Sequence, residues 1–221
     1  MASAQDLRKR IKSVGNTQQI TKAMKMVASA RMRKAQARAE GVGPYAEKLG
    51  QIMRRVSGSI AGGTSPLLDA RPIKKTAYVI VGADKGLAGA YSSNLAKFAE
   101  QTFADKDKSA IEIIASGRKV VDHFASRGYT VSAKFTGYSD KPEYSDARAL
   151  MREAQNQFLA GQVDEVVLVY TKFVNSMTQI PTQERLLPVT PPEGDQEGGA
   201  YFYMPGEEEV LTALLPQYLE S

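Results

Sequence analysis

Residues 7–60 read LRKRIKSVGNTQQITKAMKMVASARMRKAQARAEGVGPYAEKLGQIMRRVSGSI, and this stretch decides the fold of the N-terminal part of the chain. A stripe taken every 3.5 residues from Leu7 to Ile60 is apolar at 13 of its 16 positions and keeps its seven-residue phase throughout. Such a sustained period is typical of a helix in a left-handed coiled coil. At ~1.5 Å per residue the helix would be roughly 80 Å long, which exceeds the width of a small domain. The stripe predicts one over-long helix, residues 1–60, that faces a partner.

The stripe changes face within the first half of this helix. Its three polar positions are consecutive, and a second apolar set with helical spacing lies on a neighbouring face there. The polar positions are Gln18, Thr21 and Lys25, and the second set is Ile20, Ala23, Met24 and Val27. Either the partner face rotates at this level, or two partners contact the helix together. A surface helix packed on its own domain is the alternative, but globular helices rarely exceed ~20 residues.

Gly41, Gly43 and Pro44 lie inside the heptad pattern. Proline removes one helical hydrogen bond and crowds the carbonyl four residues earlier, so we expect a kink at this point. Two helices joined by a loop at 41–44 are the alternative. The stripe stays in phase across the site, which favours one kinked helix.

Charge is distributed unevenly along the chain. Residues 1–60 hold 13 Lys or Arg and 3 Asp or Glu, a net charge of +10, whereas residues 61–221 have a net charge of −5. A basic collar surrounds the window in which the stripe changes face: Lys22, Lys25, Arg31, Arg33 and Lys34. Such a collar suits an acidic protein surface or phosphate, although a merely solvated basic face is the alternative.

Composition narrows the remaining possibilities. The length of 221 residues suffices for one domain with an appendage. No apolar run approaches the length of a membrane span, and the N-terminus has no apolar core typical of a signal peptide. Cysteine is absent, which excludes disulfides and thiolate metal sites.

An alternating α/β body follows a turn-rich linker at residues 61–75. Short β-branched or alternating runs predict strands at 76–81, 110–115, 130–135, 165–171 and 183–189. Helical patterns lie between them at 90–104, 117–127 and 144–160. This alternation predicts a Rossmann-like, mostly parallel sheet covered on both faces, within a body spanning 76–200. Residues 201–221 are expected to begin a C-terminal helix, with an acidic first turn at 207–209.

A glycine-rich turn after the first predicted strand raises the question of a nucleotide site. Gly82, Gly86 and Gly89 have the spacing G-x-x-x-G-x-x-G, which is neither the dinucleotide fingerprint nor a Walker A loop. We therefore expect Gly86 and Gly89 to serve the turn and a close helix–sheet approach where a Cβ would collide. His123 is the only histidine, and we expect it at a surface or interface. No catalytic, cofactor-binding or metal-ligating residue is predicted, and a nucleotide-dependent α/β enzyme remains one alternative.

Four stretches carry a family resemblance. Residues 16–30, NTQQITKAMKMVASA, strongly resemble the N-terminal signature of the gamma subunits of F-type ATP synthases. Residues 31–36 (RMRKAQ), 84–91 (DKGLAGAY) and 201–203 (YFY) resemble the same family at corresponding places. The likeness extends over essentially the whole chain, and the first signature is long and specific.

The resemblance implies a rotor that performs no bond chemistry. In that family the N-terminal helix pairs with a C-terminal helix inside the head of alpha and beta subunits, while the α/β body contacts the epsilon subunit and the membrane ring of c subunits. By resemblance, Lys22, Met24 and Lys25 meet the acidic lever of a beta subunit, and Tyr201 and Tyr203 lie near the ring-facing foot. Contact with the membrane would be indirect, through the ring, on the cytoplasmic face of a bacterial cell membrane. No cofactor and no nucleic acid are implied.

One departure from the family is large. Family members continue with a long second helix, whereas this sequence ends at Ser221 as that helix begins, which suggests a fragment of a longer protein. Pro216 would also disturb a continuous helix there. The further alternative, a nucleic-acid-binding protein with a basic helical arm, would need a polar face opposite its basic groove contacts, but this helix has an apolar stripe throughout.

Overall fold

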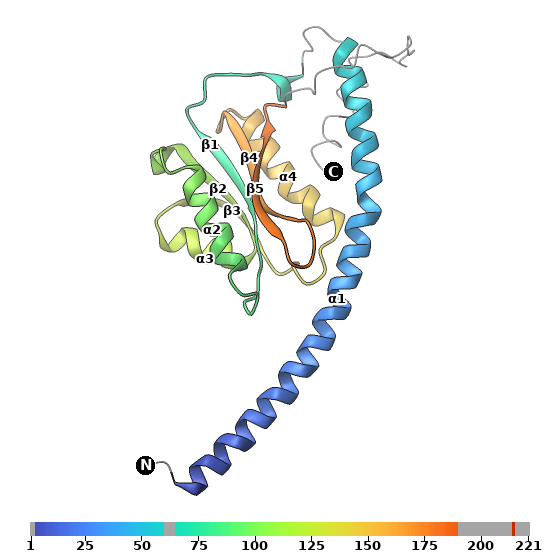
Figure 1. Cartoon of the computed structure of the whole chain (residues 1–221). Helices are drawn as coiled ribbons and strands as arrows, with labels where there is room; N and C mark the ends of the chain where they lie inside the picture. The colour runs from blue at the N-terminus through green and yellow to red at the C-terminus, as the bar shows by residue number, and fades with distance from the viewer. Residues whose placement is uncertain (1–2, 60–64, 190–213, 215–221) are drawn as a thin grey trace. The chain divides into compact units, whose positions relative to one another are not determined.

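The computed structural model describes residues 3–59, 65–189 and 214, and it contains a long helix and an α/β body. The chain divides into two compact units, one ending at Gly50 and one beginning at Gln51. The long helix, α1, runs from Ala4 to Ser59 and comprises 56 residues (Figure 1). It continues without interruption through Pro44, which confirms a single helix over two helices joined by a loop at 41–44. A kink at Pro44 stays a prediction.

The start of α1 is fixed by a reciprocal cap. The backbone N–H of Ser3 donates to the Asp6 carboxylate at 3.2 Å, and the backbone N–H of Asp6 donates to the Ser3 hydroxyl at 3.3 Å. Each side chain satisfies an N–H that has no partner within the helix. The negative charge of Asp6 also lies at the positive end of the helix dipole.

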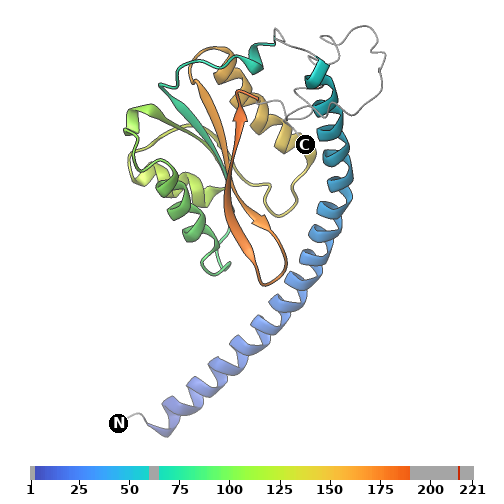
Figure 2. The ribbon, with the colours of Figure 1, turned by 45° about the horizontal axis from the view of Figure 1, so that its top comes forward.

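The body is a five-stranded sheet between two layers of helices (Figure 2). The strands are β1 (Thr76–Val81), β2 (Ile111–Ser116), β3 (Thr130–Phe135), β4 (Glu165–Phe173) and β5 (Gln179–Leu187), in the spatial order β3-β2-β1-β4-β5. The pairings among β3, β2, β1 and β4 are parallel, and β5 is an antiparallel edge strand. The expected mostly parallel α/β body is therefore confirmed.

Two apolar cores separate the three layers of the body. Helices α2 (Tyr91–Thr102) and α3 (Arg118–Ser126) cover one face of the sheet, where Phe103 packs against Tyr78 of β1 and Phe124 packs against Phe103. Helix α4 (Tyr144–Leu159) covers the other face, where its apolar side chains pack with residues of β1, β2 and β4. The chain order reverses between β1 and β4, and parallel α/β folds bind ligands at the carboxyl ends of strands near such a reversal.

The bounds predicted from the sequence agree with the observed bounds of most of these elements to within a few residues. The bounds of β1 and β3 agree with the expected ranges, and α4 is one residue shorter than expected. The edge strand β5 starts at Gln179, four residues before the expected start, because Pro181 obscured its first half. Proline is tolerated on an edge strand, where one side of the backbone needs no ladder partner. Two 3-10 turns, Pro66–Leu68 and Lys108–Ala110, were not expected. Most of the expected C-terminal helix, with Tyr201 and Tyr203, lies outside the described residues.

Candidate functional site

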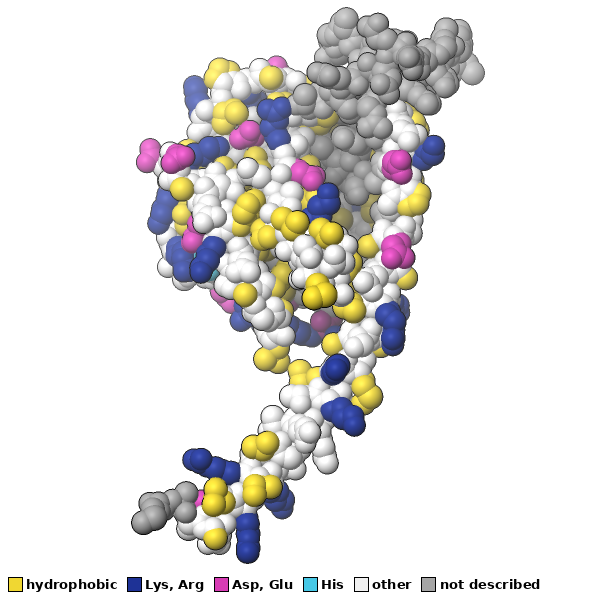
Figure 3. Space-filling view, in the orientation of Figure 1, with side chains coloured by type: hydrophobic (Ala, Val, Ile, Leu, Met, Phe, Trp, Pro, Cys, Tyr) yellow, Lys and Arg dark blue, Asp and Glu magenta, His cyan; other side chains and the backbone are white. Residues whose placement is uncertain are grey.

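The surface of α1 carries the first candidate site. The expected contact residues Lys22, Met24 and Lys25 are all exposed, with 48% of Met24 accessible. Neither lysine has a salt-bridge partner in the described part of the chain. Figure 3 shows Lys and Arg side chains distributed along this helix with apolar side chains between them. The helix thus presents unpaired positive charge beside apolar surface, which suits a partner that is both acidic and apolar.

The heptad stripe of α1 is also exposed near its start. Leu7, Ile11 and Val14 are 52%, 71% and 68% accessible. The second apolar set is similarly open, with Ile20 at 61% and Val27 at 54%. Within proteins, a helix gains most of its stability by burying such an apolar face against a partner. These residues therefore form an exposed apolar surface on α1.

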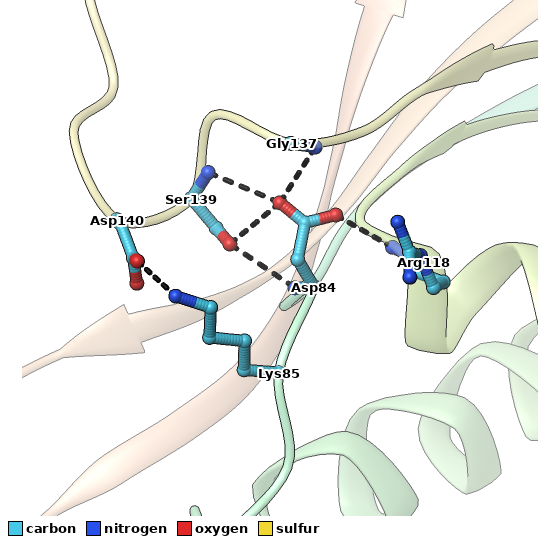
Figure 4. Close-up of a pocket in the computed structure, with 6 residues that line it drawn as sticks. All are labelled: Asp84, Lys85, Arg118, Gly137, Ser139 and Asp140. Carbon is cyan, nitrogen blue, oxygen red and sulfur yellow. Dashed lines mark hydrogen bonds and ion pairs between the residues drawn. The ribbon is translucent and has the colours of Figure 1, made fainter.

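The second candidate site is a cradle at the carboxyl ends of β1, β2 and β3 (Figure 4). We call it the Asp84 cradle, and six residues line it: Asp84, Lys85, Arg118, Gly137, Ser139 and Asp140. They come from the loop after β1, from the first turn of α3, and from the loop that follows β3. The topology brings these loops together because neighbouring parallel strands end at the same edge of a sheet.

Hydrogen bonds from two elements converge on the carboxylate of Asp84. Its Oδ2 accepts the backbone N–H of Gly137 at 2.8 Å, the N–H of Ser139 at 3.2 Å and the Ser139 hydroxyl at 2.7 Å. Its Oδ1 accepts the backbone N–H of Arg118 at 3.0 Å. Beside this carboxylate, Lys85 forms an ion pair with Asp140. Asp84 therefore ties the loop after β1 to α3 and to the loop after β3.

The electrostatics of the cradle favour an ionised Asp84. Burial would raise the pKa of this carboxyl group, but the hydrogen bonds from the Ser139 hydroxyl and from three backbone N–H groups outweigh burial and lower the pKa to about 2. Hydrogen bonds donated to a carboxylate stabilise its charged form in this way. The carboxylate is consequently a fixed negative charge across the physiological pH range.

Two glycines allow a close approach between helix α3 and the end of β1, and they are not the pair expected from the sequence. A Cβ on Gly82 would lie 2.3 Å from Val120 Cγ2, and a Cβ on Gly117 would lie 2.7 Å from the carbonyl carbon of Gly82. By contrast, a Cβ on Gly86 would meet only Lys119 Cε at 3.9 Å, and one on Gly89 would meet nothing within 4 Å. The expected collision at Gly86 and Gly89 is therefore wrong. Gly89 lies in the turn before α2 with a φ of 57°, which favours glycine.

Sequence reasoning missed Ser139 and Gly117. The available signal was the run Ser116-Gly117-Arg118, in which a helix begins after a glycine that has no side chain to cap it. Such a start requires a cap from elsewhere in the chain. His123 of α3 is partly buried, and its Nε2 lies 3.0 Å from Glu100 Oε1 of α2. His123 thus joins α3 to α2 within the body, and a position at an interface with another subunit stays a prediction.

Comparison with known proteins identifies the family. The family model described as ATP synthase matches residues 3–221. The ATP synthase gamma chain of Moorella thermoacetica is 43% identical over 220 residues, which cover 100% of this chain and 78% of that protein. The gamma chain of Desulforamulus reducens is likewise 43% identical, over 223 residues, with the same coverage of both proteins.

A solved structure shows the same fold. A chain from the central stalk and c-ring structure of Tetrahymena thermophila mitochondrial ATP synthase aligns with a TM-score of 0.68 and 20% identity. The alignment covers 91% of this chain and 88% of that chain. Because the family model and the gamma chain relatives match nearly the whole sequence, the chain belongs to the ATP synthase gamma chain family and is a non-catalytic part of that complex.

Proposed function

We propose that the chain works as the rotor of its complex, with α1 as one strand of a turning shaft. The single observation that carries this proposal is the open surface of α1, on which an exposed apolar stripe runs beside Lys22 and Lys25, which have no salt-bridge partner among the described residues. A helix of 56 residues needs a partner along its apolar face. Within this family, the partner proposed is a C-terminal helix, and both would turn inside the head of alpha and beta subunits.

The contact with the head must hold and then release. Exposed charge pairs are each worth ~0–1 kcal/mol, so contacts made by Lys22 and Lys25 with acidic residues of a beta subunit can be broken in every step of rotation. A large apolar contact would hold one orientation too strongly. We propose that Met24, between these lysines, adds a small apolar contact that keeps the orientation specific.

The body is proposed to be the foot of the rotor. It would contact the epsilon subunit and the ring of c subunits, and Tyr201 and Tyr203 are proposed to lie near the ring. Among the helices that the structure describes, none is long and apolar enough to cross a lipid bilayer. Attachment to the cytoplasmic face of a bacterial membrane is therefore proposed to pass through the ring.

A charge substitution on α1 tests the role of the shaft. Met24→Lys places a third positive charge between Lys22 and Lys25, and we expect assembled enzyme to lose coupling between ATP hydrolysis and ion pumping. Met26→Lys is the matched control, because Met26 is 63% exposed and lies about 200° around the helix from Met24. Both variants are assembled with the remaining subunits, and hydrolysis and pumping are measured in vesicles. If Met24→Lys pumps as well as the parent, this face of α1 does not contact the head.

A further inference from the structure

The Asp84 cradle has the position and the donors of an anion site. It lies at the carboxyl ends of parallel strands and at the N-terminus of α3, where doubly wound folds hold phosphate on backbone N–H groups. The loop after β1 nevertheless lacks the glycine spacing of a dinucleotide fold. The backbone N–H groups that such a fold would offer to a phosphate therefore need another acceptor here.

That acceptor is the chain's own carboxylate, on Asp84. The two oxygens of Asp84 accept four hydrogen bonds between 2.7 and 3.2 Å from Gly137, Ser139 and Arg118. In addition, the Ser139 hydroxyl accepts the backbone N–H of Asp84 at 3.1 Å, so this side chain is bonded to Asp84 in both directions. A second anion entering here would find these donors engaged and a negative charge already present.

The close packing of backbone around the cradle holds the first turn of α3, and with it the Arg118 N–H, in place independently of Asp84. Gly117 N–H donates to Phe135 O at 2.8 Å, and Lys119 N–H donates to Ala83 O at 3.0 Å. The backbone of Gly117 approaches Gly82 so closely that a Cβ would overlap it. These contacts would keep the first turn of α3 against the ends of β1 and β3 after the carboxylate is removed.

We infer that Asp84 is the built-in anion of a latent anion site: its carboxylate closes the cradle to phosphate and carboxylate ligands, and its removal opens a site for a small anion. The native body is thereby kept from binding phosphate groups at the place where its fold would accept them. The inference concerns the body alone and does not depend on the rotor function.

Chemical rescue of the whole chain tests the inference. Asp84→Ala should lower the melting temperature, and sodium formate, whose carboxylate matches the one removed, should raise it again by about 2–4 °C in a saturable manner. Inorganic phosphate should also stabilise this variant more than sodium chloride does at equal ionic strength. Sodium chloride at equal ionic strength should give a much smaller rise, and none of the three salts should act selectively on the parent.

Two further variants separate a vacated site from a general salt effect. Asp84→Asn fills the same volume with an amide, so formate should not stabilise it selectively. Asp84→Ala combined with Ser139→Ala lacks the hydroxyl donor, and its formate response should weaken. If Asp84→Ala does not remain folded, the yield of refolded chain in formate is compared with that in chloride. Equal responses to formate and chloride in Asp84→Ala, or an equal formate response in Asp84→Asn, would overturn the inference.

Discussion

At the scale of single residues, Asp84 links the chemistry of the cradle to the stability of the body. The pKa of about 2 in the folded chain lies below the ~3.9 of an unperturbed aspartate. A lowered folded-state pKa stabilises the fold above the unfolded value, and this stabilisation is lost as the pH falls through the folded value. Acid should therefore weaken the cradle between about pH 4 and pH 2.

Asp84→Asn should remove this pH dependence. At pH 7 we expect the free energy of unfolding to fall by about 1–2 kcal/mol, a figure reduced to allow for solvent screening of a partly exposed group. The difference from the parent should shrink as the pH approaches 2. Urea unfolding at several pH values measures this difference, with Asp105→Asn as the control because the Asp105 side chain is exposed. A constant difference across the range would show that the charge of Asp84 is not involved.

The glycines of the body differ sharply in what they tolerate. Gly117→Ala should lower the free energy of unfolding by about 3 kcal/mol, because it adds a backbone overlap to a φ of 96°. Gly86→Ala should stay within about 0.5 kcal/mol of the parent, since its Cβ has room. Thermal or urea unfolding of both variants checks the contrast. Equal losses would mean that the body relaxes around Gly117.

The difference between these glycines also shows what a sequence can reveal about a site. The spacing of the glycines in the loop after β1 can be taken directly from the sequence, and it excluded the common nucleotide-binding motifs. The partners of Asp84 could not be read, because Gly137 and Ser139 are 53 and 55 residues away in the chain. Only the topology, with β1 and β3 flanking β2, brings them together.

At the scale of elements, α1 was the most predictable part of the chain and β5 the least. The seven-residue period of α1 repeats over its whole length, so many positions support the same assignment. Strand β5 has the exposed, mixed pattern of an edge strand, with Glu184 bonded to the Tyr170 hydroxyl at 2.8 Å on the neighbouring strand. Such a strand is specified by its neighbour more than by its own residues.

The exposed stripe of α1 should make the isolated chain self-associate. Ile11→Glu with Val14→Glu should reduce this association, since both side chains are about 70% exposed on the stripe. Ser13→Glu with Asn16→Glu adds the same charge to the opposite face of the helix and is the control. Sedimentation velocity over a concentration series measures the effect. A strictly monomeric parent in which α1 is nevertheless fully helical would contradict this account of the stripe.

At the scale of the whole molecule, the uneven charge should govern how fast the chain joins the head. Residues 1–60 carry a net charge of +10, and attraction of this kind raises association rates at low salt. We expect the association rate with an alpha–beta head to fall roughly tenfold from low to physiological ionic strength. Lys22→Gln with Lys25→Gln should flatten that dependence, and Lys172→Gln on β4 should leave it largely unchanged. Stopped-flow mixing measures all three proteins, and the same salt dependence in each would exclude steering by the collar.

The position of β1 at the middle of the sheet has a consequence for how the chain is made. Thr76 pairs with Ile111 on one side and with Glu165 on the other, so its second ladder needs a strand encoded 89 residues later. Ribosomes add roughly 5–20 residues per second, so one edge of β1 keeps its backbone N–H and C=O groups without ladder partners for roughly 4–18 s. During that interval α1 has already emerged and β1 offers an open edge to other nascent chains. The sheet of the body is thus completed only after β4 has been made, and during this interval the growing chain needs protection from aggregation.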